Sequence, residues 1–315
     1  MKRPLVGVLA TAVLGSAALM SAAGPACASS PTTASSPSSP SSPPSPSSPS
    51  FVSSAGQQTT ASARPKAVDF AGTVALGGCS GSVIRLPSSE GDDPALVMSN
   101  GHCIEPGMPH AGEVVVDRPS TRTFTLLDAK ANSVATLKAT KIAYATMTDT
   151  DISLYELTDT YDQIKKRYGI KALPLSAAHP RKGAAISVVS GYWKKIYSCA
   201  IDGFVYRMKE GEWTWKDSVR YTPACQTIGG TSGSPVIDDA TGKVVAVNNT
   251  GNEDGERCTF NNPCEIDEKG NVTVRKGINY AQQTYGIPRC FADGNKLDLD
   301  RPGCRLPRPA EDDRR

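Results

Sequence analysis

The chain has 315 residues, of which 21% are charged and 6% aromatic, and its formal net charge is +3. This length is enough for one large domain or two ordinary ones with a sizeable core. Because acidic and basic residues are nearly balanced and interspersed, the sequence gives no sign of a basic surface for nucleic acid or anionic lipid. We therefore expect no nucleic acid as a partner, and the composition excludes no enzyme class.

The first 28 residues have the features of a secretory signal peptide. A short basic start at residues 1–3 precedes a mostly apolar stretch over residues 4–20, and the sequence ACA at 26–28 fits the cleavage pattern of small residues. The apolar stretch is short for a membrane span. We expect cleavage after Ala28 and export of the chain, with no membrane span. A lipid anchor at Cys27 is the alternative.

Residues 29–65 are dominated by Ser, Pro, Thr and Ala. Such a segment has too few large apolar side chains to form a core, so we expect an extended, disordered linker or a propeptide. From residue 66 the composition changes to that of a folded domain, which we expect to reach residue 289. Residues 290–315 would form a polar tail.

Within this domain, short apolar or alternating runs recur between Gly, Asp, Asn and Pro residues, which predicts an all-β barrel or sandwich. The predicted strands cover residues 71–76, 82–86, 95–98, 113–116, 121–127, 133–145, 152–157, 185–189, 196–208, 212–221, 235–237, 243–247 and 272–281. One helix is predicted over 159–168, because an acidic start and a basic last turn suit the helix dipole. Its position suggests a connector between two β halves.

The nine cysteines fit an oxidising compartment, and removal of Cys27 would leave eight. Eight cysteines allow many pairings, so the connectivity is a hypothesis. A hairpin folded about residues 209–211 would bring Cys199 opposite Cys225. The other expectations are a small loop closed by Cys258 and Cys264, and a tail held by Cys290 and Cys304. With no C-x-x-C spacing and three histidines, we expect no metal.

Three short motifs contain residue types used in nucleophilic catalysis. They read MSNGHC at 98–103, DTDISL at 149–154 and GGTSGSP at 229–235. The last motif places Ser232 beside glycine amides that could stabilise an oxyanion, but a serine alone is a weak nucleophile and needs a base. Taken singly, each motif also fits an exposed histidine, an aspartate in a strand-entry turn or a plain glycine turn.

Together, and in the order His, Asp, Ser, the motifs resemble those of the chymotrypsin-like (trypsin-like) serine peptidases. The resemblance extends from residue 67 to about residue 285. It implies two six-stranded antiparallel β-barrels with the active site in the cleft between them. It also implies protein or peptide substrates, no cofactor and a monomer. Thr231 and Ser234 look like the bacterial secreted branch of the family, which would make the chain a secreted bacterial protein.

Carried over to this sequence, the resemblance implies that Ser232 is the nucleophile, His102 the general base and Asp151 the residue that orients His102. The amides of Gly230 and Ser232 would form the oxyanion hole. Cys79–Cys103 would match the family disulfide that pins the histidine loop. Asp149 is the alternative candidate for the residue that orients His102. The family places its aspartate directly before an inward-facing alternating run, and this favours Asp151.

The sequence departs from the digestive members of the family at two places. Thr231 stands where they carry an aspartate that pairs with a new N-terminus, so other contacts must hold the serine loop. Gln226 stands where a trypsin-type pocket carries an aspartate, so a preference for Arg or Lys lacks its usual charge partner. Thr227, Asn248 and Asn249 are expected to line the pocket with Gln226.

Other classes of serine hydrolase fit the sequence less well. An α/β-hydrolase needs its histidine after the serine, whereas all three histidines, including His110 and His179, precede Ser232. We expect those two at the surface. The subtilisin order needs an aspartate before His102 and more helix. The alternative from another class is an inactive secreted binding protein with a peptidase fold.

Overall fold

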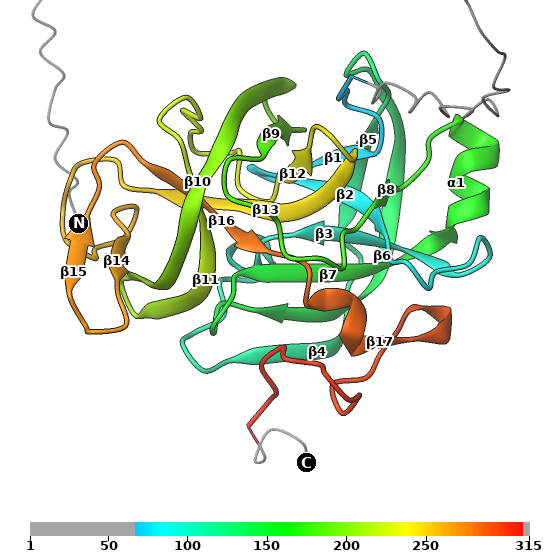
Figure 1. Ribbon diagram of the computed structural model, residues 1–315. Coiled ribbons are helices and arrows are strands. Elements are labelled where there is room, and N and C mark those ends of the chain that lie inside the picture. The colour runs from blue at the N-terminus through cyan, green and yellow to red at the C-terminus, as the bar shows by residue number, and fades with distance from the viewer. Residues whose placement is uncertain (1–66, 311–315) are drawn as a thin grey trace, which may run out of the picture. The chain divides into compact units, whose positions relative to one another are not determined.

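The computed structural model describes residues 67–310, so the expected signal peptide and Ser/Pro-rich segment lie outside the described residues. The described chain is mostly β-structure and contains two closed rings of six antiparallel strands (Figure 1). The all-β double barrel expected from the sequence is therefore confirmed.

The first barrel closes through the pairing of its first two strands, in the ring order β1-β5-β6-β7-β3-β2. These strands are β1 (Thr73–Leu76), β2 (Cys79–Arg85), β3 (Pro94–Ser99), β5 (Thr123–Leu127), β6 (Ser133–Thr146) and β7 (Ile152–Thr160). Alternate side chains of these strands fill the interior, and Phe124 packs edge-on against Tyr155 with ring centroids 5.1 Å apart. Outside the ring, β4 (Val114–Pro119) pairs with β6 and β8 (Leu173–Pro174) with β2.

A single helix, α1 (Tyr161–Tyr168), leads from the first barrel toward the second. It begins two residues later than predicted, because Thr160 caps it and forms a capping box with Gln163. Asp159, predicted to start the helix, lies in β7, and its carboxylate pairs with Arg167 at 2.5 Å. The helix ends at Gly169, which takes a φ of +70° that other residues rarely adopt.

The second barrel follows the ring order β11-β16-β13-β12-β9-β10 and closes through the β10–β11 hairpin. Its strands are β9 (Ala185–Ser190), β10 (Lys195–Glu210), β11 (Trp213–Tyr221), β12 (Pro235–Asp238), β13 (Lys243–Gly251) and β16 (Asn279–Gln283). The hairpin turn comprises Gly211 and Glu212, so Glu210 belongs to a strand and not, as predicted, to the turn.

The prediction of one strand over 272–281 was wrong. β15 (Val272–Val274) ends early and pairs with β14 (Cys264–Ile266), which itself pairs with β10 outside the ring. A turn at Gly277, with a φ of +77°, then redirects the chain into β16. Because both parts are short and β-prone, sequence pattern alone did not reveal the break.

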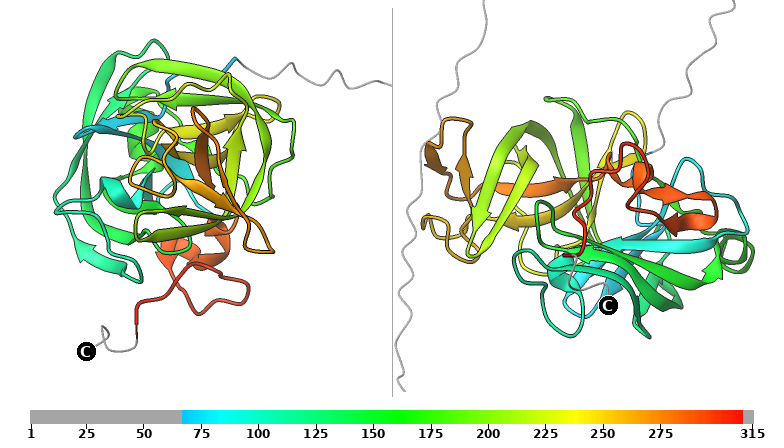
Figure 2. Two further views of the ribbon diagram at one scale, coloured as in Figure 1. Left: turned by 90° about the vertical axis from the view of Figure 1, so that its left-hand side faces the viewer. Right: turned by 90° about the horizontal axis from the view of Figure 1, so that it is seen from below.

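Two tryptophans join the barrels. Trp213 and Trp215 are both buried and lie two residues apart on β11, so they share one face. The indole of Trp213 donates to the carbonyl of Pro109 at 2.9 Å, and that of Trp215 donates to the carbonyl of Met147 at 3.0 Å. Since both acceptors belong to loops of the first barrel, these bonds fix the relative position of the two barrels, which Figure 2 shows side by side.

The C-terminal segment packs against the first barrel and has little core of its own. It contains η2 (Ile287–Cys290), β17 (Phe291–Ala292), η3 (Asp293–Asn295) and β18 (Lys296–Leu297). Phe291 is buried in a cluster with Ile84 and Leu86. Asn295 accepts a hydrogen bond from Ser89 and donates one to the Tyr161 hydroxyl. This segment therefore adds to a hydrophobic cluster that is separate from the interior of the first barrel and also contains side chains of the second barrel.

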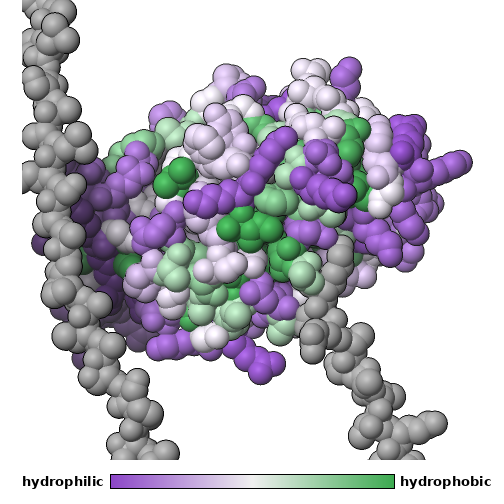
Figure 3. Space-filling view, turned by 90° about the horizontal axis from the view of Figure 1, so that it is seen from above, coloured by the Kyte–Doolittle hydropathy of each residue, from purple (hydrophilic) through white to green (hydrophobic). Residues whose placement is uncertain are grey.

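Four disulfides join the cysteines of the described chain. The pairs are Cys79–Cys103, Cys199–Cys225, Cys258–Cys264 and Cys290–Cys304. Each pair matches the one expected from the sequence. Within residues 67–310, no helix is long and apolar enough to cross a membrane. The face seen from above is mainly hydrophilic around small apolar areas (Figure 3).

Candidate functional site

The pairing of β3 with β7 brings His102 and Asp151 together. Ser99 at the end of β3 lies opposite Ser153 near the start of β7, so the residues just beyond these strands meet. The imidazole Nδ1 of His102 lies 2.6 Å from Oδ2 of Asp151, and the backbone amide of His102 donates to Oδ1 at 3.0 Å. The Asp151 side chain is fully buried, whereas that of His102 is 22% exposed.

Neighbouring side chains hold this pair in place. The amide of Asn100 donates to the carbonyl of Asp151 at 2.8 Å, and the hydroxyl of Ser153 donates to the carbonyl of Asn100 at 2.7 Å. His102 lies in the short η1 turn (Gly101–Cys103), where a side chain on Gly101 would collide with the carbonyl of Thr146. A glycine here lets the histidine turn approach the neighbouring strand.

The environment of His102 favours its charged form. Burial lowers the pKa of the imidazole. The nearby Asp151 carboxylate and its hydrogen bond raise the pKa, and the Glu210 carboxyl group raises it as well. Together these effects outweigh burial, so the net pKa lies above its usual value. The Nδ1 contact with Asp151 leaves Nε2 as the nitrogen free to exchange a proton with a neighbour.

Asp149, the competing aspartate, lies apart from this pair. Its side chain is 40% exposed and its carboxylate pairs with Lys216 at 2.5 Å. His110 and His179 are exposed, and neither lines the cavity that contains His102. Their nearest acidic partners are Glu212, at 3.3 Å, and Asp217, also at 3.3 Å.

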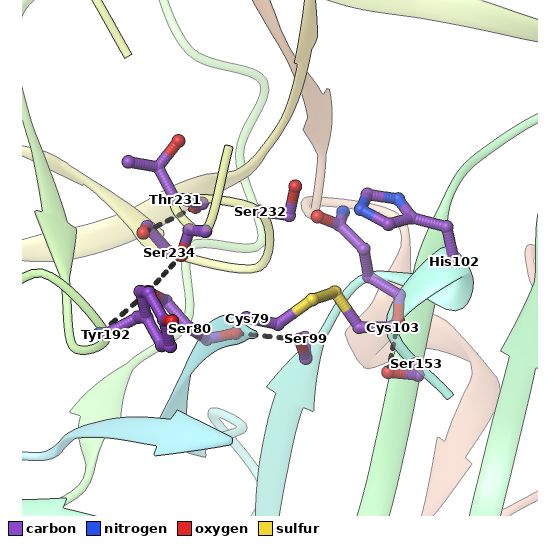
Figure 4. Close-up of a disulfide and its surroundings, with 12 residues drawn as sticks. Cys79, Ser80, Ser99, His102, Cys103, Ser153, Tyr192, Thr231, Ser232 and Ser234 are labelled. Carbon is purple, nitrogen blue, oxygen red and sulfur yellow. Dashed lines mark hydrogen bonds between the residues drawn. A yellow bond between two sulfur atoms is a disulfide. The ribbon is translucent and has the colours of Figure 1, made fainter. Parts of the chain in front are cut away.

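Ser232 lies across a cavity of about 100 Å³ that His102 also lines. In Figure 4 both side chains lie on the same side of the Cys79–Cys103 disulfide. The Ser232 hydroxyl donates to the carbonyl of Asn249 at 3.3 Å instead of to His102. The backbone carbonyl of Ser232 accepts from Ser80 at 2.7 Å, which ties the loop to β2.

The serine loop is held without the aspartate found in digestive peptidases. Thr231 Oγ1 donates to the carbonyl of Ile228 at 2.6 Å and accepts from the Asn248 amide at 3.0 Å. The Trp193 indole donates to the carbonyl of Gly229 at 2.7 Å. Since N–H and C=O point in opposite directions across a trans peptide, this bond turns the amide of Gly230 away from Trp193.

Three of the four residues predicted to line the substrate pocket do line the cavity, and one lies outside it. Thr227, Asn248 and Asn249 line the cavity. The structure does not bring Gln226 there: its side chain is exposed and donates to the carbonyl of Pro223 at 2.7 Å. The amide of Asn248 is used to hold Thr231, whereas the side-chain N and O of Asn249 pair with no described group.

Several residues that line the cavity were not predicted from the sequence, among them Glu210 and Trp215. Glu210 was assigned to the hairpin turn. A two-residue turn with glycine first is a common hairpin connection, and this signal could have placed Glu210 in the strand.

One group of potential metal ligands occurs in the described chain, formed by Cys79, His102 and Cys103. Both cysteines belong to one disulfide, and a metal needs the thiolate form of cysteine. This group therefore does not have the chemistry of a metal site.

A comparison with known protein families identifies the family of this chain. The family model of a trypsin-like peptidase domain matches residues 79–247, a span that contains His102, Asp151 and Ser232. None of the curated proteins compared with the chain matches it.

Solved structures of bacterial proteases are similar to the chain at low identity. The MamO protease domain from Magnetospirillum magneticum is 12% identical, with a TM-score of 0.42, over 68% of this chain and 92% of that one. The Nocardiopsis protease is 11% identical, with a TM-score of 0.38, over 69% and 93%. Protease A of Thermobifida fusca is 13% identical, with a TM-score of 0.37, over 68% and 90%. On the family match, which covers more than half of its length, this chain belongs to the trypsin-like peptidases.

Proposed function

We propose that the chain is a serine endopeptidase that hydrolyses peptide bonds through a covalent acyl-enzyme. The observation that supports this most directly is the buried Asp151 carboxylate on Nδ1 of His102, with Ser232 lining the same cavity. A histidine whose one nitrogen is fixed by a carboxylate presents the other as a base. In the first step, the Ser232 hydroxyl turns from the Asn249 carbonyl to Nε2 of His102.

The reaction then follows from these groups. Ser232 Oγ attacks the substrate carbonyl carbon while its proton passes to His102, and the amides of Gly230 and Ser232 bind the resulting oxyanion. The C–N bond breaks as His102 gives its proton to the leaving amine. Water, deprotonated by His102, then attacks the acyl carbon; the C–O bond to Ser232 breaks as His102 returns the proton to Oγ, which releases the acid product and regenerates the Ser232 hydroxyl. Asp151 stays ionised throughout and stabilises the imidazolium.

We also propose that the protein works outside the cell, as a monomer on protein or peptide substrates. The four disulfides support an oxidising compartment. The basic start, apolar stretch and ACA sequence at the N-terminus support export.

Diisopropyl fluorophosphate tests the proposal, because only a serine activated by a base displaces its fluoride. We expect folded protein to gain one diisopropylphosphoryl group on the peptide that contains Ser232, seen by mass spectrometry after digestion. Protein unfolded beforehand should not react. If folded protein stays unlabelled and cleaves no peptide in a library, the inactive binding protein becomes the better reading.

Replacing the Trp193 indole tests whether the amide of Gly230 binds the oxyanion. Trp193→Phe keeps an aromatic ring but removes the donor to the Gly229 carbonyl, which frees the Gly229–Gly230 peptide to rotate. We expect kcat to fall about fivefold with KM little changed, since a hydrogen bond of this kind contributes about 1 kcal/mol. Trp213→Phe is the matched control: it loses a bond to Pro109 and should lower stability, not kcat. Equal kcat values for both variants would contradict the oxyanion role.

A further inference from the structure

The cavity beside Ser232 contains a buried carboxyl group that the proposed reaction does not use. Glu210 ends β10 and is only 4% exposed, yet it lines the cavity together with His102 and Ser232. Oε1 accepts a hydrogen bond from the backbone amide of Asn261 at 2.9 Å. Oε2 is buried and has no hydrogen bond of good geometry among the described residues, although the Thr250 hydroxyl interacts with this carboxyl group. A buried, unpaired carboxylate oxygen is costly in free energy, so it calls for a partner.

The rest of the cavity wall consists mostly of amide and hydroxyl side chains, with one more carboxylate and two aromatic rings. Among the described residues that line it, Glu253 is a second, exposed carboxylate, and there is no Lys or Arg. Trp215 and the half-exposed Phe260 supply apolar surface. A Lys or Arg side chain combines an apolar stem with a charged end, and these two parts match the aromatic wall and the carboxylates.

Burial raises the pKa of Glu210 above its usual value, although the Thr250 hydroxyl, the Asn261 amide and the charge on His102 act in the opposite direction. A cation placed at Oε2 would lower this pKa and so favour the ionised form. A charge-assisted hydrogen bond in such a site is stronger than a neutral one.

On the basis of the proposed function, we propose that Glu210 forms a subsite for a basic side chain of the substrate, close to the scissile bond. The ammonium or guanidinium group would donate to Oε2, while Oε1 keeps its bond to Asn261. This subsite is formed by the β10–β11 hairpin and not by the position before the serine loop that Gln226 occupies. It gives the peptidase a basic preference without an aspartate at Gln226.

The test uses the purified, disulfide-bonded chain and a peptide library varied at three positions on either side of the cleaved bond. Matched peptides then carry either Lys or norleucine, which lacks the ammonium group, at each position. We expect one position where kcat/KM for Lys exceeds that for norleucine by about 10- to 100-fold, the range for a hydrogen bond to a charged group.

Glu210→Gln should remove this preference, because the amide keeps an oxygen for Asn261 but loses the charge. The matched control is Glu212→Gln, two residues along the same hairpin, whose side chain is 48% exposed and lies outside the cavity; it should keep the preference. Absence of a Lys preference in the wild type, or its survival in Glu210→Gln, would overturn the subsite. Near-UV circular dichroism checks that both variants fold.

Binding of butylammonium tests this subsite independently of the proposed peptidase activity. Calorimetry on Ser232→Ala, which cannot form an acyl-enzyme, should show that butylammonium binds and that neutral butanol binds at least tenfold more weakly. Adding Glu210→Gln should abolish the difference. If wild-type protein neither labels nor cleaves but this difference holds, the peptidase proposal fails and the cation subsite stands. If labelling succeeds and the two ligands bind alike, the subsite fails alone.

Discussion

Ser232→Ala should lower kcat by about a million-fold, the scale seen when the nucleophile of a serine peptidase is removed. The substitution deletes one hydroxyl group, which among the described residues donates a hydrogen bond to the backbone carbonyl of Asn249, so the fold should persist. The measurement is the initial rate on the best peptide from a library, with active-site titration to exclude contaminating peptidase.

Ser88→Ala is the control, because Ser88 is exposed and lies outside all three motifs. It should cleave at the wild-type rate. Cleavage by Ser232→Ala at more than one hundredth of the wild-type rate, with the same products, would show that another residue is the nucleophile.

Asp151→Asn should lower kcat by about ten-thousandfold near neutral pH. The amide is nearly isosteric, but an asparagine that offers its N–H to Nδ1 places the histidine proton on Nε2, the nitrogen that must accept from Ser232. The carboxylate also raises the pKa of His102 against the opposing effect of burial, so this variant should have a lower histidine pKa, which can be followed by NMR titration.

Asp149→Asn gives a matched comparison from the same motif. Asp149 pairs only with the half-exposed Lys216, and such pairs contribute less than about 1 kcal/mol. Its φ of +60° suits asparagine as well as aspartate. Turnover should stay within twofold of the wild type. If Asp149→Asn were the slower variant, the assignment of Asp151 would be wrong.

Much of the fold could be predicted because strand signals are local. The alternation in 133–145 and 152–157 reports on side chains that face one core, and β6 and β7 lie there within a few residues. The helix was placed to within two residues at its start, since Thr160, one position beyond the predicted Asp159, made the better cap. The break between β15 and β16 was not predicted because the four residues between the two β-prone runs contain a single turn signal, Gly277.

The candidate site was predictable only through motif resemblance. No local property of MSNGHC or DTDISL says that these stretches meet; they meet because β3 and β7 pair in one register. The same limit explains Gln226, which was assigned to the pocket by position but whose side chain turns to the carbonyl of Pro223.

The sequence by itself determined the strand-rich domain, the order of the three motifs and the family they resemble, because these depend on residues close together in the chain. Only the tertiary structure decided which groups share the cavity. It placed Glu210 beside His102, and it anchored the Gly229 carbonyl on Trp193, 36 residues away in the chain. Contacts between distant segments depend on how the strands close each barrel and how the two barrels pack against each other, and no spacing within a single strand or loop encodes that packing.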